Sequence, residues 1–281
     1  MLKKINYFIF TKSIGLYLNI LVFLAPKKAQ MLAYTLFSTP RKGRFKANKV
    51  PKILAATTKE ILNVGDQLLQ TYRWPGTKEV IMLLHGWESN SARWKKIIPY
   101  LKELGHTIVA IDAPGHGLTS GNEFNVILYA EYIQKAVQKF KPSILIGHSI
   151  GGAACVYNQF RYPNDGIKKI VLLGAPADIG LIVKNYITLL WLNFRNTRLL
   201  NAHFQNKFGL DITNFSVDIL AKNSFAEALI IHDVDDNVVS YNAAQKLKAG
   251  FKNSLFMQTE GLGHSLHCDT VYEKIVAFIK N

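Results

Sequence analysis

The segment from residue 141 to residue 152 constrains the fold of this chain more than any other stretch. Its apolar run Ser-Ile-Leu-Ile ends abruptly in Gly147-His-Ser149-Ile-Gly151, and a helix-compatible sequence follows at once. A turn this sharp, from strand to helix, forces the apex residue into a strained backbone conformation, and side chains two positions away would collide. Gly147 and Gly151 remove those side chains. The pattern therefore predicts a turn that holds the hydroxyl of Ser149 exposed, as a nucleophile requires.

Apolar runs and amphipathic segments alternate along the chain beyond residue 55. Strands are expected at residues 68–74, 80–85, 107–112, 143–148, 169–173, 228–232 and 255–259. Apolar spacing near 3.6 predicts helices over residues 92–104, 124–140, 153–160, 241–251 and 271–280. A Gly-X-Ser-X-Gly sequence also occurs by chance in loops, so this flanking order is what supports a structured turn. The alternation predicts an α/β fold, with a mostly parallel central sheet flanked by helices.

The net charge of +15 is concentrated near the N-terminus. Residues 1–60 contain twelve Lys and Arg and one acid, whereas the remaining 221 residues contain 22 basic and 18 acidic residues. The basic run at residues 40–52 lacks the aromatic interleaving of nucleic-acid sites, so we interpret it as a solvated linker and expect no nucleic-acid partner. Two cysteines, Cys155 and Cys268, are too few for a disulfide framework, which allows a reducing, cytoplasmic location.

Residues 5–25 form an apolar stretch that Lys12 interrupts. From Ser13 to Ala25 only thirteen uncharged residues remain, fewer than the roughly 20 that a membrane-spanning helix needs. Two interpretations stay open. The helix packs its apolar side on the catalytic domain, which the lack of a clean polar face favours, or it lies in a membrane interface with its lysines toward lipid headgroups. The second would make the protein membrane-associated through residues 1–52.

About fifty residues, 178–224, separate two predicted strands. They are too apolar for a flexible loop and predict two or three helices. Such an insertion serves either as a helical cap that lines a substrate pocket or as plain core packing. We therefore divide the chain into a basic, apolar, helical N-terminal extension at residues 1–55 and an α/β domain at 56–281 that carries the insertion.

A serine needs a general base, and that base needs an acid to orient it. Acids follow the strand at 228–232, in the sequence Asp233-Val-Asp-Asp236. Histidines follow the strand at 255–259, in Gly-Leu-Gly-His264-Ser-Leu-His267. Both clusters lie where the carboxyl ends of parallel strands meet.

From about residue 67 to the C-terminus, this chain resembles the α/β-hydrolase fold family. The order Ser, Asp, His is the order of that family. Its acid usually lies in His-Gly-X-X-Asp-X-X-Val-Pro, which implies Asp236 here. Asp233 stands where the family has Gly, and Ser240 where it has Pro. Asp233 and Asp235 therefore remain alternatives for the acid, and otherwise indicate a solvated turn.

The resemblance also assigns the base and the oxyanion donors. The family's Gly-X-Gly-His turn implies His264 as the base, with His267 as the alternative. Oxyanion donors are expected from the backbone N–H groups of Ile150 and Trp87, the latter after the family's His-Gly pair at Gly86. Asp112 and His116 correspond to a turn that shapes the site, and we interpret both as structural.

The resemblance implies a serine hydrolase that cleaves a carboxylic ester or a related small acyl compound. Ser149 would attack the acyl carbon, His264 would carry the proton and Asp236 would orient His264. Serine at the apex argues against dehalogenase or epoxide-hydrolase chemistry, for which the family uses Asp. Thioesterase, carbon–carbon hydrolase and acyltransferase activities use the same triad, and a catalytically silent binding protein is a further alternative. We expect no metal and no cofactor.

Overall fold

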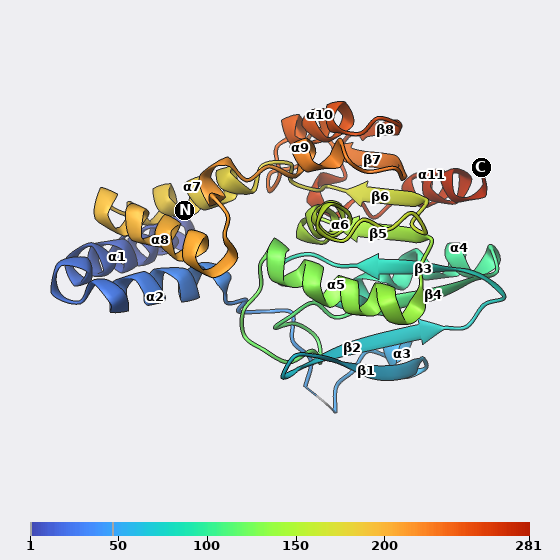
Figure 1. Cartoon of the computed structure of the whole chain (residues 1–281), viewed down its shortest axis with the longest axis horizontal. Coiled ribbons are helices and arrows are strands. Elements are labelled where there is room, and N and C mark those ends of the chain that lie inside the picture. The colour runs from blue at the N-terminus through green and yellow to red at the C-terminus, as the bar shows by residue number, and fades with distance from the viewer. Residues whose placement is uncertain (1, 47) are drawn as a thin grey trace. The chain divides into compact units, whose positions relative to one another are not determined.

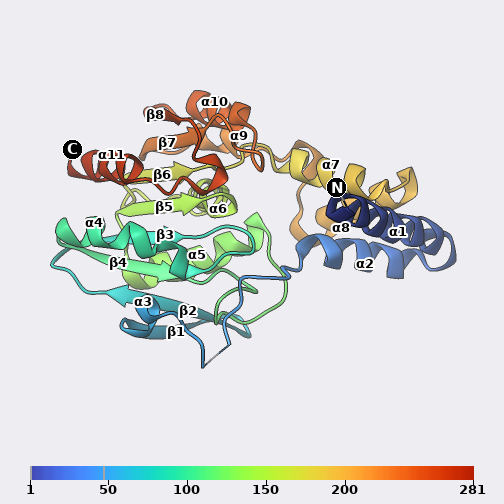
Figure 2. The same ribbon diagram turned by 180° about the vertical axis from the view of Figure 1, so that it is seen from behind.

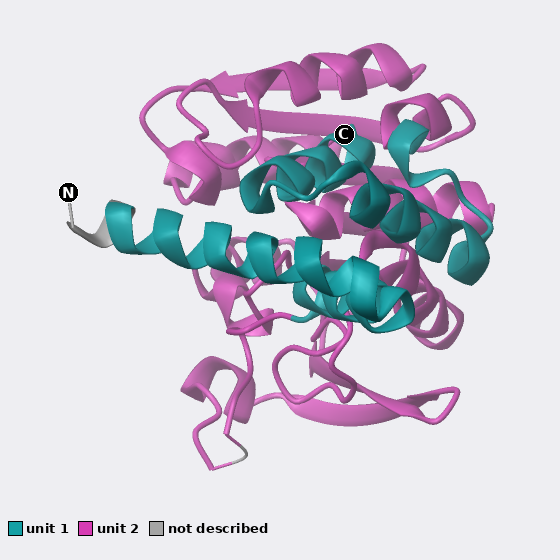
Figure 3. Cartoon of the chain, turned by 90° about the vertical axis from the view of Figure 1, so that its left-hand side faces the viewer, with its two compact units in different colours: residues 1–39, 178–216 teal, residues 40–177, 217–281 magenta. Residues whose placement is uncertain are grey.

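The computed structural model describes residues 2–46 and 48–281. The chain forms two compact units (Figure 3). Unit 1 combines Met1–Thr39 with Asp178–Ser216, and unit 2 combines Pro40–Ala177 with Val217–Asn281. Two segments that the sequence separates by well over a hundred residues, the N-terminal helices and the insertion, therefore form one unit.

Unit 2 contains an eight-stranded sheet in the order β1-β2-β4-β3-β5-β6-β7-β8 (Figure 1). The six strands from β3 to β8 are parallel, and β2 is antiparallel to both of its neighbours. The strands are β1 Thr58–Val64, β2 Gln67–Trp74, β3 Lys78–Leu84, β4 His106–Ile111, β5 Ile144–His148, β6 Lys169–Leu173, β7 Glu227–Asp233 and β8 Ser254–Thr259. The mostly parallel sheet predicted from the sequence is confirmed, with β2 to β8 within two residues of the expected ranges. The sequence missed β1, an edge strand in which only Leu62 is buried.

Helices cover both faces of this sheet. Helices α5 and α6 lie over one face (Figure 1), and α4 and α11 lie over the other (Figure 2). The helical segments of unit 2 are α3 Lys52–Ala55, η1 Ser91–Lys96, α4 Ile98–Glu103, α5 Val126–Phe140, α6 Ile150–Arg161, α9 Val217–Ala221, α10 Tyr241–Gly250, η3 Gly263–Ser265 and α11 Asp269–Lys280. The end of the predicted insertion, α9, packs on α6 and α10 and so belongs to the α/β unit.

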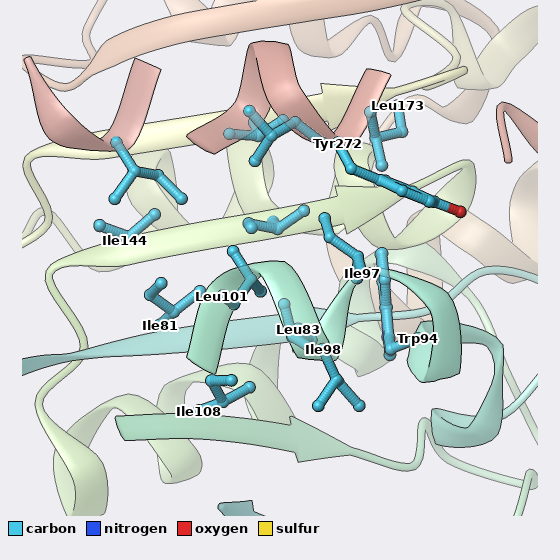
Figure 4. Packing of buried hydrophobic residues seen from close by; sticks show 14 of the residues in the cluster. Ile81, Leu83, Trp94, Ile97, Ile98, Leu101, Ile108, Ile144, Leu173 and Tyr272 are labelled. Carbon is cyan, nitrogen blue, oxygen red and sulfur yellow. The ribbon is translucent and has the colours of Figure 1, made fainter. Parts of the chain in front are cut away.

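The core of unit 2 follows the alternation of side chains along each strand. Leu83 and Ile144 point toward α4 and α11, in the cluster that also contains Leu101 and Tyr272 (Figure 4). The intervening residues of the same strands, such as Met82, are equally buried on the opposite face. Burial on both faces is why these strands have continuous apolar runs in the sequence.

Unit 1 is helical. It consists of α1 Leu2–Leu24, α2 Pro26–Ser38, α7 Ile179–Leu190, α8 Phe194–Phe208 and the short η2 Ile212–Asn214. Leu18, Ala33 and Leu190 form its small core. Gly15 allows α1 to approach the end of α7, because a Cβ atom there would overlap the carbonyl group of Leu190. Within unit 1, the N-terminal helix therefore packs on the insertion helices.

Two expectations about the N-terminal region need correction. The count of thirteen residues was too strict, because α1 continues through Lys12 and is long and apolar enough, over Ile5–Leu24, to cross a membrane by length and composition. The basic run after α2 is not a solvated linker throughout. The backbone N–H of Phe45 donates to the carbonyl oxygen of Gly117, and Arg44 donates to that of Thr119.

The two-sided core predicts the effect of shortening Leu83, which is completely buried. Leu83→Ala should lower the free energy of unfolding by about 2–5 kcal/mol, because it removes apolar contacts and leaves a cavity. Leu68→Ala in β2, where the side chain is exposed, should change it by about 0.5 kcal/mol or less. Urea unfolding followed by circular dichroism measures both. Equal losses in the two variants would contradict the core described above.

Candidate active site

Three side chains predicted from separate parts of the sequence meet at the carboxyl ends of the parallel strands. Ser149 follows β5, Asp236 follows β7, and His264 lies in η3 after β8. The carboxyl edge of a parallel sheet is where α/β proteins build their sites, because the loops there converge.

The three side chains form one hydrogen-bonded chain. The Nε2 atom of His264 lies 3.0 Å from the Oγ atom of Ser149, and its Nδ1 atom lies 2.7 Å from Oδ2 of Asp236. The other carboxylate oxygen of Asp236 accepts the backbone N–H groups of Val238, at 2.8 Å, and Val239, at 2.9 Å. With an ionised Asp236, Nδ1 of His264 carries the proton, which leaves Nε2 free to accept from the serine hydroxyl.

The environment of Asp236 keeps it ionised. Burial alone would raise the pKa of this carboxyl group, but the hydrogen bonds from His264, Val239 and Val238 hold the pKa below its ordinary value. A carboxylate that stays charged can both orient an imidazole and stabilise it when it takes up a proton.

The backbone at Ser149 has the strained geometry that the sequence predicted, with φ 53° and ψ −128°. The expectation of an exposed serine was wrong, because Ser149 is buried, with 7% of its surface exposed. The neighbouring glycines are sterically required. A Cβ atom on Gly147 would lie 2.6 Å from the Cα atom of Gly152, and one on Gly151 would lie 2.5 Å from the carbonyl oxygen of His85. Larger residues at either position would force β5, α6 or the end of β3 to move.

His85 orients the peptide group expected to donate to an oxyanion. Its Nε2 atom accepts the N–H of Ala113 at 2.9 Å, so Nδ1 carries the proton and donates to the carbonyl oxygen of Gly86 at 2.8 Å. Burial lowers the pKa of His85 to about 3, which keeps the ring neutral. The carbonyl and N–H of a planar trans peptide point in opposite directions, so this bond turns the N–H of Trp87 away from His85.

Both expected oxyanion donors border the serine. Gly86 lies against Ser149, since a Cβ atom on Gly86 would be 2.7 Å from that of the serine. Trp87 follows directly in the chain. Ile150 begins α6, where the first N–H groups of a helix have no acceptor within the helix.

Asp233 has a role that the sequence analysis missed, and its interpretation as part of a solvated turn was wrong. Its side chain is fully buried and accepts hydrogen bonds from the hydroxyl of Thr259, at 2.7 Å, and the N–H of Leu262, at 3.0 Å. It thereby anchors the loop that carries His264. In the sequence, the only indication of this role was that Asp233 stands where the family has Gly.

His148 supports the same loop. It is buried beside the serine, and its Nε2 atom donates to the carbonyl oxygen of His264 at 2.8 Å. Burial, followed by the nearby charge of Arg93, lowers the pKa of His148 well below its ordinary value, so the ring is neutral. The base is thus held by two buried side chains, His148 and Asp233.

The alternatives for acid and base make other contacts. The Nδ1 atom of His267 lies 2.7 Å from the hydroxyl of Tyr272, and burial together with nearby cations lowers its pKa to about 4. Asp235 is exposed and accepts the N–H of Gly261. The structure brings neither of them to the Ser149–His264 pair.

The remaining predicted residues shape the site. Asp112 is buried and accepts hydrogen bonds from the hydroxyl of Tyr72 and from both the N–H and the hydroxyl of Ser91. The Nε2 atom of His116 accepts the N–H of Glu88. Their structural interpretation is confirmed.

Over residues 2–46 and 48–281, no group of three or more His, Cys, Asp or Glu side chains could hold a metal ion.

Comparison with known proteins identifies the family. The profile of the alpha/beta hydrolase fold matches residues 79–225, and the chain belongs to this family. It is 24% identical over 263 residues to the bifunctional esterase/perhydrolase DCH of Acinetobacter calcoaceticus, covering 74% of this chain and 94% of that protein. It is 22% identical to the non-heme haloperoxidase of Rhodococcus erythropolis, covering 75% and 95%.

A solved structure shares the fold. Est1E from Butyrivibrio proteoclasticus, with ferulic acid bound, superimposes with a TM-score of 0.66 at 19% identity, covering 79% of this chain and 98% of that one. Together, the family and the names of the relatives support a hydrolase.

The buried contacts of Asp233 predict a pH-dependent loss of stability in Asp233→Asn. Burial would raise the pKa of Asp233, but the bonds from Thr259, Leu262 and other N–H groups hold it below its ordinary value. A lowered folded pKa stabilises the protein above the unfolded pKa of about 3.9, and that contribution is lost as the pH falls through the folded value. Asp233→Asn should therefore cost about 1.5–3 kcal/mol at pH 7, and less below about pH 4.

Urea unfolding of the wild type and Asp233→Asn at pH 7 and pH 3 measures this difference. Exposed Asp235→Asn, two residues away, is the matched control and should show a smaller loss at pH 7. A gap between wild type and Asp233→Asn that is the same at both pH values would show that the charge of Asp233 is not what anchors the loop.

Proposed function

We propose that the protein is a serine hydrolase that cleaves carboxylic esters through an acyl-enzyme intermediate. The observation that carries this proposal is the chain of hydrogen bonds from Ser149 through His264 to Asp236. A strained turn presents the serine, and the base and acid come from two other loops. Each group therefore has a partner suited to nucleophilic catalysis.

In this mechanism, Ser149 Oγ attacks the carbonyl carbon while Nε2 of His264 takes the hydroxyl proton. The carbonyl oxygen becomes an oxyanion, which the N–H groups of Trp87 and Ile150 would stabilise. His264 then returns the proton to the leaving alcohol, and the acyl group stays on the serine. A water molecule, deprotonated by His264, repeats the attack and releases the carboxylic acid.

A second activity is favoured by the relatives. One of them is named a bifunctional esterase/perhydrolase and another a non-heme haloperoxidase. In perhydrolysis, hydrogen peroxide would replace water in the second attack, so that the acyl-enzyme releases a peracid instead of an acid. The first half of the reaction, and the residues that perform it, would be unchanged.

The nucleophile can be identified by covalent labelling. A fluorophosphonate probe should react with the wild-type protein, and Ser149→Ala should abolish the labelling because it removes the attacking oxygen. Ser254→Ala, in β8, is the matched control and should label like the wild type. Gel fluorescence and mass spectrometry of the labelled peptide measure the result. Labelling that persists in Ser149→Ala would reject the assignment.

The acid can be tested by its charge. Asp236→Asn should reduce kcat on p-nitrophenyl butyrate by about 10⁴-fold, because an amide no longer fixes the imidazole tautomer or stabilises its charged form. Asp235→Asn should change kcat by about twofold or less, since its exposed carboxylate does not contact His264. Equal activities of the two variants would remove Asp236 from the mechanism. Adding thioesters and hydrogen peroxide to the assay separates the remaining activities.

A further inference from the structure

Unit 1 exposes more large apolar side chains than unit 2. Among the described residues, fifteen of the 23 large apolar side chains that are exposed lie in unit 1, which is much the smaller unit. Contiguous apolar surface of this kind marks interaction sites in soluble proteins. Ten of the fifteen belong to α1: Ile5, Tyr7, Phe8, Ile9, Phe10, Leu16, Tyr17, Ile20, Phe23 and Leu24.

Helix α1 is apolar on two opposite sides. On one side, Leu18 and Val22 lie one helical turn apart and are completely buried. Leu16 and Ile20 recur on the other side and are 62% and 54% exposed. A helix that is apolar all round is typical of a protein core or of a membrane environment, and only one side of α1 has a core to face.

Two polar side chains of α1, Lys12 and Asn19, bond to other parts of unit 1, so Lys12 is compatible with an apolar outer side of the helix. The ammonium group of Lys12 donates to the carbonyl oxygens of Leu189, at 2.7 Å, and Thr188, at 3.3 Å, at the end of α7. It also lies 4.0 Å from the centre of the Trp191 ring. Lys12 therefore caps a helix C-terminus. It does not face lipid headgroups, as the second of the two sequence interpretations had required.

Asn19 is turned inward in the same way. Its amide donates to the carbonyl oxygen of Trp191 at 2.8 Å and accepts the N–H of Asn193 at 2.8 Å. In α2, Gln30 donates to the carbonyl oxygen of Leu199 at 2.6 Å. Three polar side chains of unit 1 thus bond within the unit, while many of its large apolar side chains are exposed.

Charge selects among the possible partners. Unit 1 contains nine Lys and Arg and two Asp and Glu, and the first acid of the whole chain is Glu60. Exposed Lys27 and Lys28 follow directly after the exposed pair Phe23 and Leu24, where α1 turns into α2. Apolar side chains beside lysines match the boundary between acyl chains and anionic headgroups.

Helix α1 alone is long enough to cross a bilayer, but its bonds to the shorter α7 favour lying on the bilayer over crossing it. Helix α7, twelve residues long, spans about 18 Å, well short of the roughly 30 Å hydrocarbon core. Lys12 and Asn19 tie α1 to α7 and to the turn that leads into α8. Crossing the bilayer would break these bonds inside hydrocarbon, where no water could replace them.

We propose that the outward side of α1, which carries Ile9, Leu16 and Ile20, docks into the interface of an anionic lipid bilayer. The exposed rings of Phe8 and Trp191 lie beside this side of the helix, at the end of α7. Phe8 and Trp191 already pack edge to face, with ring centres 5.7 Å apart. Tryptophan is favoured at the headgroup level, because its ring combines an apolar body with a polar N–H group. The proposal rests on unit 1 and does not depend on the catalytic assignment.

Vesicle flotation of the full-length protein tests this docking. It should float with vesicles of phosphatidylcholine and phosphatidylglycerol, and much less with phosphatidylcholine alone. The triple variant Ile9→Gln, Leu16→Gln, Ile20→Gln should reduce flotation by about tenfold or more, because it removes apolar area that the lipid would bury. Glutamine is a good helix former, so α1 should persist, and circular dichroism checks this.

A second triple variant, Ile61→Gln, Ile219→Gln, Leu255→Gln, is the matched control. These side chains are similarly exposed but lie in unit 2, so the control should float like the wild type. The proposal is overturned if the α1 variant floats like the control, or if flotation does not require phosphatidylglycerol. It is also overturned if the protein never floats but the α1 variant converts a dimer to a monomer, which would make a second copy the partner.

Tryptophan fluorescence gives an independent readout. Trp191 is 62% exposed, whereas Trp74 and Trp94 are buried. Adding the anionic vesicles should shift the emission to the blue, and Trp191→Phe should abolish the shift, because it removes the indole that reports the contact with lipid. A shift that persists in Trp191→Phe would place this residue away from the lipid.

Discussion

The close approach of the first turn of α6 to the end of β3 is the contact on which the candidate site depends. Gly151 packs against the backbone carbonyl groups there, and Gly147 packs against Gly152 across the turn. Both contacts exclude a Cβ atom, so the turn can be as tight as Ser149, with its positive φ, requires. Because the same contacts bring β3 beside the serine, they also set where Gly86 and Trp87 lie.

The two aspartates at the end of β7 have different roles in positioning His264. Asp236 bonds the imidazole of His264, while buried Asp233 holds the loop from which that imidazole projects. Each carboxylate replaces lost hydration with several N–H or hydroxyl donors, which is what makes a buried charge tolerable. The end of β7 therefore positions His264 in two ways: Asp236 bonds its imidazole, and Asp233 bonds the backbone of its loop.

Unit 1 follows a different physical rule. Its Lys12 and Asn19 side chains bond to carbonyl oxygens near the end of α7, while many of its large apolar side chains lie on the surface. If unit 1 docks on lipid as proposed, the esterase proposed for unit 2 would work where apolar acyl compounds concentrate. The two proposals are independent, but their chemistry is compatible.

The sequence by itself determined the sheet and the turn at Ser149, because local spacing and apolar runs encode them. Its resemblance to the α/β-hydrolase family implied Asp236 and His264. Tertiary structure decided what depends on distant partners. The burial of Asp233 needs Thr259 and Leu262, and the inward turn of Lys12 needs carbonyl oxygens at the end of α7. The sequence did not predict edge strand β1, because only one of its residues is buried and it has little apolar pattern. The pairing of the N-terminal helices with the insertion joins segments over a hundred residues apart, and no local pattern encodes such a contact.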